Sequence, residues 1–256
     1  MQITKQIADR ATVIAARPDG DGAATVASIP NELIASDSPY AGPVGALALA
    51  ADRWVDHANA ANARLLPDAR HAENLTAAAS IIGEHFRNVV TAGKTETQAI
   101  AVADATALAP LPGEAGLYAE FRHDFRSASI SDKAKIAASA NLQQTSAILQ
   151  AGWEAFPDTP DNIRTALEER HMLLAHVHRT GLQASHQRQS TLDSILATGP
   201  DLDAALDAAK KALQDHTSRK ERRAHLEGSL RSIISLVATA GQISPEQAFT
   251  LLMAKK

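Results

Sequence analysis

The chain has 256 residues, with 25 lysines and arginines against 29 aspartates and glutamates, which gives a formal net charge of −4 at pH 7. This acidic balance argues against a surface dominated by contacts with nucleic acid or anionic membranes, because such surfaces are strongly basic. The sequence contains no cysteine, so disulfide bonds and thiolate metal sites are excluded and a reducing compartment is compatible.

Alanine supplies 53 of the residues, whereas Phe, Tyr and Trp together supply 9. Alanine is the strongest helix former, and almost every segment carries helix start and stop signals. The sequence therefore predicts an all-α fold, a multi-helix bundle of about eight or nine helices. Each alanine buries little apolar area, so many close helix contacts must stabilise such a core.

The first 42 residues are predicted to form an amphipathic helix followed by a turn-rich arm. Ile3, Ile7 and Ile14 fall on one stripe of a helix over residues 3–16. Prolines and glycines punctuate the residues that follow, and no alternating β-branched run is long enough to indicate a strand. We expect this arm to reach a neighbouring subunit, with the three isoleucines as partner-binding residues.

An alanine-rich helical layer is expected over residues 43–156. Thr95 and Gln98 have the spacing of a capping box, which predicts a helix start there. Residues 110–113, Pro-Leu-Pro-Gly, are a firm break. The predicted helices cover residues 43–66, 67–92, 95–108, 117–127 and 131–156.

The most distinctive prediction is one long helix over about residues 161–198. Pro160 and Asp161 fit its start, and Gly199 followed by a proline fits its end. At 1.5 Å per residue the helix is roughly 57 Å long, whereas a compact sphere of this chain length is about 47 Å across. The molecule would then be elongated or part of something larger.

The middle of this helix is polar, since residues 179–191 contain Gly181 and a single large apolar residue, Leu182. Glycine costs about 1 kcal/mol relative to alanine inside a helix, so a bend or break is expected at Gly181. The polar centre either bridges two helical layers in solvent or is the surface that a partner contacts. On the second interpretation Arg179, Leu182 and His186 bind the partner.

Three further helices are predicted, from residue 202, over residues 218–241 and over residues 244–253. Ser218 with Glu221, and Ser244 with Gln247, have the spacing of capping boxes. Together with the long helix they form a layer over residues 157–256. Alternatively, residues 43–256 are one domain.

Two Glu-x-x-His pairs on predicted helices suggest a ferritin-like di-metal bundle as one alternative function. Such bundles add a lone glutamate from each of two further helices. Against this alternative, Glu154 lies only two residues before the helix-ending Phe156, and two such pairs are close to chance. The candidate ligands are Glu84, Glu120, His123, Glu154, Glu168 and His171.

A second alternative is contact with nucleic acid through a basic helix start at residues 219–231. Cationic side chains there would bind phosphates and give a salt-dependent affinity. No aromatic residues are interleaved for base stacking, and cations at a helix N-terminus oppose the helix dipole. The candidate contact residues are Arg219, Lys220, Arg222, Arg223 and Arg231.

No phosphate loop, nucleophile motif or calcium loop is complete, so no catalytic residue and no cofactor is predicted. Charges interrupt the first ten residues, where a signal peptide needs its apolar stretch, and no apolar run approaches the ~20 residues of a membrane span. The sequence predicts a soluble, non-enzymatic helical protein, cytoplasmic or particle-associated, that packs against copies of itself or a larger complex. In composition it looks like components of phage particles.

Overall fold

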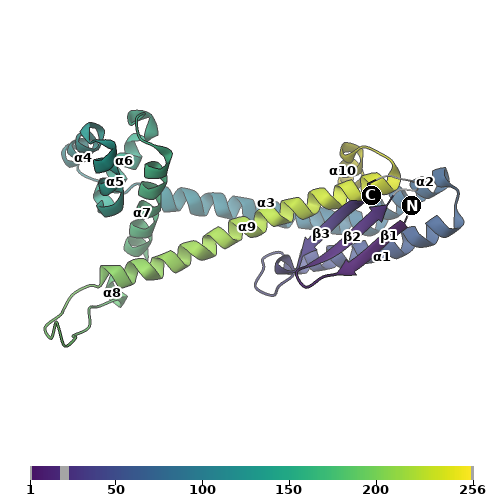
Figure 1. Cartoon of the computed structure of the whole chain (residues 1–256), viewed down its shortest axis with the longest axis horizontal. Coiled ribbons are helices and arrows are strands. Elements are labelled where there is room, and N and C mark those ends of the chain that lie inside the picture. Colours follow the sequence, from purple (N-terminus) through teal and green to yellow (C-terminus); the bar gives the residue numbers. More distant parts are fainter. Residues whose placement is uncertain (1, 18–22, 255–256) are drawn as a thin grey trace. The chain divides into compact units, whose positions relative to one another are not determined.

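The computed structural model describes residues 2–17 and 23–254, and its predominantly helical content confirms the all-α class. The chain divides into two compact units: unit 1 comprises residues 1–99 and 218–256, and unit 2 comprises residues 100–217. Two helices, α3 (Gly83–Leu108) and α9 (Leu202–Gly241), contribute residues to both units (Figure 1). The layer boundary expected at residue 157 lies inside unit 2.

Unit 1 begins with a three-stranded antiparallel sheet, so the predicted helix over residues 3–16 is wrong. The strands β1 (Gln2–Ile7), β2 (Ala11–Arg17) and β3 (Thr25–Pro30) lie in the order β1-β2-β3. The spacing of Ile3 and Ile7 misled the prediction, because residues four apart share a face in a helix and in a strand alike. The turn between β1 and β2 is closed by a bond from the Ala8 amide to the Ala11 carbonyl.

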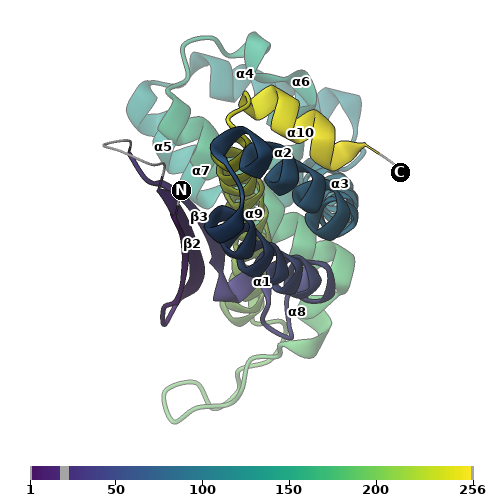
Figure 2. The same ribbon diagram turned by 90° about the vertical axis from the view of Figure 1, so that its right-hand side faces the viewer.

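One face of this sheet belongs to the hydrophobic core of unit 1, and the helices of this unit lie on that side (Figure 2). The register places Ile3 opposite Ala16, and Ile14 opposite Ala27, so all four side chains share the buried face. Helix α1 (Ala41–Arg64) packs on it with the fully buried Trp54. Further core side chains come from η1 (Asn31–Leu33), α2 (Pro67–Ala77), η2 (Ala78–Ile82), α3, α9 and α10 (Pro245–Met253).

Helices α3 and α9 are each continuous across a position at which the sequence predicted the start of a new helix. The Thr95 hydroxyl donates to the Thr91 carbonyl inside α3, and the Thr217 hydroxyl donates to the Leu213 carbonyl inside α9, so neither segment begins a helix. Gly93 does not end a helix either, because it serves close packing: a Cβ there would lie 3.2 Å from the Leu226 Cδ2 atom. The capping box of Ser244 and Gln247, by contrast, is confirmed at the start of α10.

Unit 2 contains a helical cluster built by α4 (Ala115–Ser127), α5 (Ile130–Ser139), α6 (Leu142–Ala151), η3 (Trp153–Ala155) and α7 (Asp161–Thr180). The predicted helix over residues 131–156 is therefore divided, because Asn141 and Gln144 form a capping box that starts α6. Phe125 and Phe156 meet edge to face in the core, with ring centroids 5.2 Å apart.

The long helix predicted over residues 161–198 is also wrong beyond its first half. Helix α7 ends at Thr180, and the next residue, Gly181, has the left-handed φ of 68° that glycine adopts without strain. A short helix, α8 (Leu182–Ser185), follows and then a non-helical segment to residue 201. The break falls at the glycine where a bend was expected, and the longest helix is instead α9, with 40 residues. No helix among the described residues is long and apolar enough to cross a bilayer.

Candidate interaction site

Residues 186–201 of unit 2, hereafter the hairpin loop, form a hydrogen-bonded hairpin between α8 and α9. At its base the Asp201 amide donates to the His186 carbonyl and the Arg188 amide donates to the Gly199 carbonyl, both at 2.8 Å. At its tip Thr191 and Ser194 exchange two backbone hydrogen bonds of 3.1 Å. These bonds join the two arms of the loop at its base and at its tip.

Two consecutive turns at the tip expose three large aliphatic side chains. Leu192 occupies a central position of the turn closed by Thr191 and Ser194. Ile195 and Leu196 are the central residues of the next turn, in which the Ala197 amide donates to the Ser194 carbonyl at 3.2 Å. Their exposed fractions are 92 % for Leu192, 68 % for Ile195 and 90 % for Leu196.

Leucine and isoleucine are unusual at these positions. Central turn residues are normally Gly, Pro, Asn, Asp or Ser, whose side chains suit a backbone that bends in water. A sequence that departs from its local rule with no visible structural gain usually does so at a functional site. The hairpin tip is therefore the strongest candidate for a binding surface among the described residues.

The three residues expected to bind a partner near the centre of the long helix lie at the root of this loop. Leu182 packs against the small apolar cluster that joins the end of α7 to the start of α9. The Arg179 guanidinium donates to the Thr106 carbonyl, and His186 Nδ1 lies 2.9 Å from the Leu182 carbonyl oxygen. These residues make local contacts at the root of the loop, whereas the tip carries the exposed apolar side chains.

The three isoleucines predicted to bind a partner are divided by the sheet. Ile3 and Ile14 point into the core of unit 1 and are buried, because they share the face that α1 covers. Ile7, at the end of β1, is exposed. Of the three, Ile7 alone could contact a partner in this fold.

The arginines in the basic stretch of α9 form ion pairs with carboxylates. Arg219 pairs with Glu96, and Arg222 Nη1 lies 3.2 Å from Asp37 Oδ2. Arg223 and Arg231 both contact one carboxylate, that of Glu227. Lys220 lies on the same stretch. Because carboxylates partner these four arginines, the stretch is less free to bind phosphates than its sequence suggests.

The predicted metal ligands are not brought together. Glu84 belongs to unit 1, and the remaining five belong to unit 2. Glu168 accepts a hydrogen bond of 2.6 Å from the Trp153 indole, and His171 is buried against Thr145 and the Ala109 carbonyl. Within residues 2–17 and 23–254, no three His, Asp or Glu side chains are grouped to hold a metal ion. The ligand set that the ferritin-like alternative requires is thus not assembled in the described chain.

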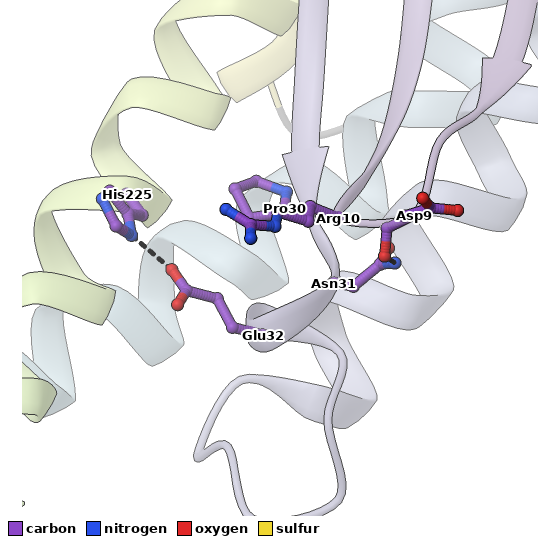
Figure 3. A pocket seen from close by; sticks show the side chains of 6 residues that line it. All are labelled: Asp9, Arg10, Pro30, Asn31, Glu32 and His225. Carbon is purple, nitrogen blue, oxygen red and sulfur yellow. Dashed lines mark hydrogen bonds and ion pairs between the residues drawn. The ribbon is translucent and has the colours of Figure 1, made fainter.

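A shallow pocket of about 450 Å³ lies in unit 1 beside the turn between β1 and β2 (Figure 3). It presents both charges, with Arg10 against Asp9 and Glu32, and the His225 ring is hydrogen-bonded to the Glu32 carboxylate. Neighbouring opposite charges largely neutralise one another, so the pocket selects no ligand class.

A second hollow, hereafter the α9/α10 groove, has a volume of about 480 Å³ in unit 1. Its apolar lining comes from Ile234, Pro245 and Phe249, and Arg231 and Glu246 add opposite charges. Phe249 is 44 % exposed although its ring also meets Phe86 edge to face at 6.4 Å. An aromatic ring that is held in place yet open to water is a suitable floor for an apolar side chain.

The chain matches no protein-family profile, no curated protein and no solved structure.

The tip residues of the hairpin loop were missed in the sequence because Leu192, Ile195 and Leu196 have helical spacing and continue an apolar face. The signal that could have found them is the polar run Gln-Arg-Gln-Ser-Thr over residues 187–191, which follows the left-handed Gly181. It separates these aliphatic residues from the packed part of the helix.

Proposed function

We propose that this is a non-enzymatic assembly protein that packs against copies of itself or a larger complex, with the hairpin loop as its docking element. The observation that supports this proposal is the set of three aliphatic side chains exposed at a hydrogen-bonded tip. Its alanine-rich composition, which resembles that of phage-particle components, fits a role in such a particle or in a comparable cytoplasmic complex.

Burial of the tip would drive docking. Removing one Leu or Ile side chain from water contributes about 1.5–3 kcal/mol, so the three together supply roughly 5–9 kcal/mol. Association itself costs about 4–15 kcal/mol in lost freedom of motion. The tip alone is therefore a weak anchor, and it needs either neighbouring contacts or many copies to give a stable complex.

The backbone of the hairpin reduces the cost of docking. Hydrogen bonds at the base and the tip already fix the turns that present Leu192, Ile195 and Leu196. A loop that is ordered before binding loses less conformational entropy on binding. This preorganisation favours recognition of a shaped apolar groove over nonspecific contact.

A photo-crosslinking amino acid at position 192 tests the proposal, in an extract of the source cells and in the purified protein. We expect one discrete adduct whose yield falls at least about fivefold when Leu196 is changed to serine, because hot-spot residues in one pocket act together. The control places the crosslinker at Val102 of α3, which is also in unit 2 and 66 % exposed but has no comparable turn around it. Equal adduct yields from positions 192 and 102 would show that the tip is not a docking element.

A further inference from the structure

The chain carries both an exposed apolar tip, in unit 2, and an apolar groove of matching character, in unit 1. We infer that the partner of the hairpin loop is a second copy of this chain, whose α9/α10 groove receives Leu192 and Leu196. This inference rests on the proposed function and adds the identity of the partner. It requires no contact between the tip and the groove of the same molecule.

The lining of the groove is largely apolar, as docking of the aliphatic tip requires. Ile234, Pro245 and Phe249 provide an apolar surface in a hollow of about 480 Å³. The exposed Phe249 ring and the exposed leucines would each leave water on docking. Large apolar side chains seated in a partly preformed pocket form the centre of many protein interfaces.

Charges around the groove complement those of the loop. At the groove Arg231 pairs with Glu227 at 2.5 Å, and the same carboxylate also receives a longer contact of 3.7 Å from Arg223, so Glu227 is divided between two cations. Asp193 lies between the aliphatic tip residues, and its carboxylate has no ion pair among the described residues. Docking of the tip would bring this carboxylate to Arg231 at the groove.

The same docked orientation offers a second pair of opposite charges, one at the groove and one in the loop. Glu246 lines the groove, and its pKa is held below the usual range because the Ser244 hydroxyl and its own backbone amide donate to its carboxylate. Arg188 in the base of the hairpin loop has no ion pair within the described chain. Asp193 and Arg188 of the loop would thus meet one base and one acid at the groove, Arg231 and Glu246. Such complementarity favours one register of docking over others.

The resulting contact is heterologous, since the tip and the groove are different surfaces. A docked pair that leaves one tip and one groove free continues to a closed ring or an open filament, whereas reciprocal docking of two copies gives a closed two-fold dimer. Growth in mass beyond a dimer therefore distinguishes the ring or filament from a two-fold dimer.

The experiment measures the mass of the full chain by light scattering and sedimentation velocity from about 5 to about 200 μM, a range suited to a weak interface. The tip variant is Leu192→Ser with Leu196→Ser. The groove variant is Thr250→Arg, which places a long charged side chain in the groove from an exposed position and leaves the core intact. Unchanged circular dichroism and melting confirm that each variant is folded.

We expect the wild-type mass to rise with concentration past that of a dimer, and each variant alone to weaken association at least about tenfold. Mixing the two variants should restore a complex that stops at a one-to-one dimer, because only one tip and one groove remain intact. Val102→Ser serves as the control and should associate like the wild type.

Other outcomes overturn the inference. A wild-type chain that stays monomeric over the whole range refutes self-docking, while an adduct from position 192 with another protein would leave the proposed function standing. Association that survives Thr250→Arg refutes the groove as the receptor. Association lost in both variants and not restored by mixing refutes the pairing of tip with groove.

Discussion

The Glu96 carboxylate on α3 accepts a hydrogen bond of 2.8 Å from Nε of Arg219 on α9. The glutamate side chain is only 10 % exposed, whereas that of the arginine is 38 % exposed. The bond to Glu96 raises the pKa of the Arg219 guanidinium. This ion pair gives the first arginine of the basic stretch a structural role within unit 1.

Replacing Arg219 and replacing Glu96 should lower the free energy of unfolding by different amounts. Arg219→Met leaves a nearly buried carboxylate without its partner, and we expect a loss of about 3 kcal/mol in the free energy of unfolding. Glu96→Gln leaves a guanidinium that can turn to water, with an expected loss of about 1 kcal/mol. Urea denaturation of the two variants measures both values. Equal losses, or a larger loss for Glu96→Gln, would show that burial of the carboxylate does not control the energetics.

The Tyr40 hydroxyl is buried and, among the described residues, has no hydrogen-bond partner. Burial raises the pKa of this phenol, and the nearby Glu96 carboxylate raises it further, although three arginines oppose them. Tyr40→Phe removes an unsatisfied group, so we expect the free energy of unfolding to stay within about 0.5 kcal/mol or to rise.

Tyr118→Phe is the matched control, because its hydroxyl donates to the Leu111 carbonyl at 2.8 Å. Loss of that bond should cost about 1 kcal/mol. Thermal unfolding of the two phenylalanine variants checks the contrast. If Tyr40→Phe were the costlier change, the Tyr40 hydroxyl would have to hold a bound water or another partner.

We expect His171 to make the stability of unit 2 depend on pH. The side chain is fully buried, and burial lowers its pKa more than the bond to the Ala109 carbonyl raises it. A neutral ring fits the site, with Nε2–H donating to that carbonyl at 3.3 Å and Nδ1 lying 3.0 Å from the Thr145 hydroxyl oxygen.

The linkage between protonation and folding determines whether stability rises or falls with pH. As pH falls below about 6.5, the unfolded chain protonates this histidine while the folded chain does not, so stability falls by at most about 1.4 kcal/mol per pH unit. The loss stops once the pH passes below the lowered pKa of the folded state. His171→Gln keeps a donor and an acceptor and should flatten this dependence between pH 5 and 7. Parallel pH profiles for the two proteins would mean that His171 does not titrate on unfolding.

Local signals in the sequence predicted the elements that depend on local chemistry, and longer-range packing decided the rest. The capping box of Ser244 and the left-handed break at Gly181 act within a few residues, so both could be anticipated. Ser218 has the same cap spacing, yet α9 passes straight through it because its neighbours on α3 hold it there with contacts such as that of Arg219 with Glu96. Such contacts join residues more than 100 positions apart, which periodicity cannot detect.

The candidate site failed to appear in the sequence for a related reason. Leu192 and Leu196 are spaced four residues apart, and that spacing fits a buried helix face as well as two successive turns. Only the hydrogen bonds of the hairpin distinguish the two conformations. Chain packing therefore determines whether these leucines are core or surface.

The outer edge of β1 is closed at one point by a side chain of α1. The Asn59 amide accepts from the Ile3 N–H at 3.3 Å and donates to the Ile3 carbonyl at 2.9 Å, as a neighbouring strand would. Lys5, two residues further along, pairs with Asp52 of α1. A charged lysine and a satisfied backbone both discourage pairing of an edge strand with another chain.

Asn59→Ala should lower the free energy of unfolding by about 1–2 kcal/mol, since both backbone groups of Ile3 lose their partner. It should also raise light scattering on mild heating, because the exposed edge can pair between molecules. Asn62→Ala is the control: it lies on the same helix, and its amide atoms are buried with no hydrogen bond among the described residues. Loss of the Asn62 amide should leave the free energy of unfolding and the light scattering nearly unchanged. Equal effects of the two substitutions on stability and scattering would show that the amide of Asn59 does not protect the sheet edge.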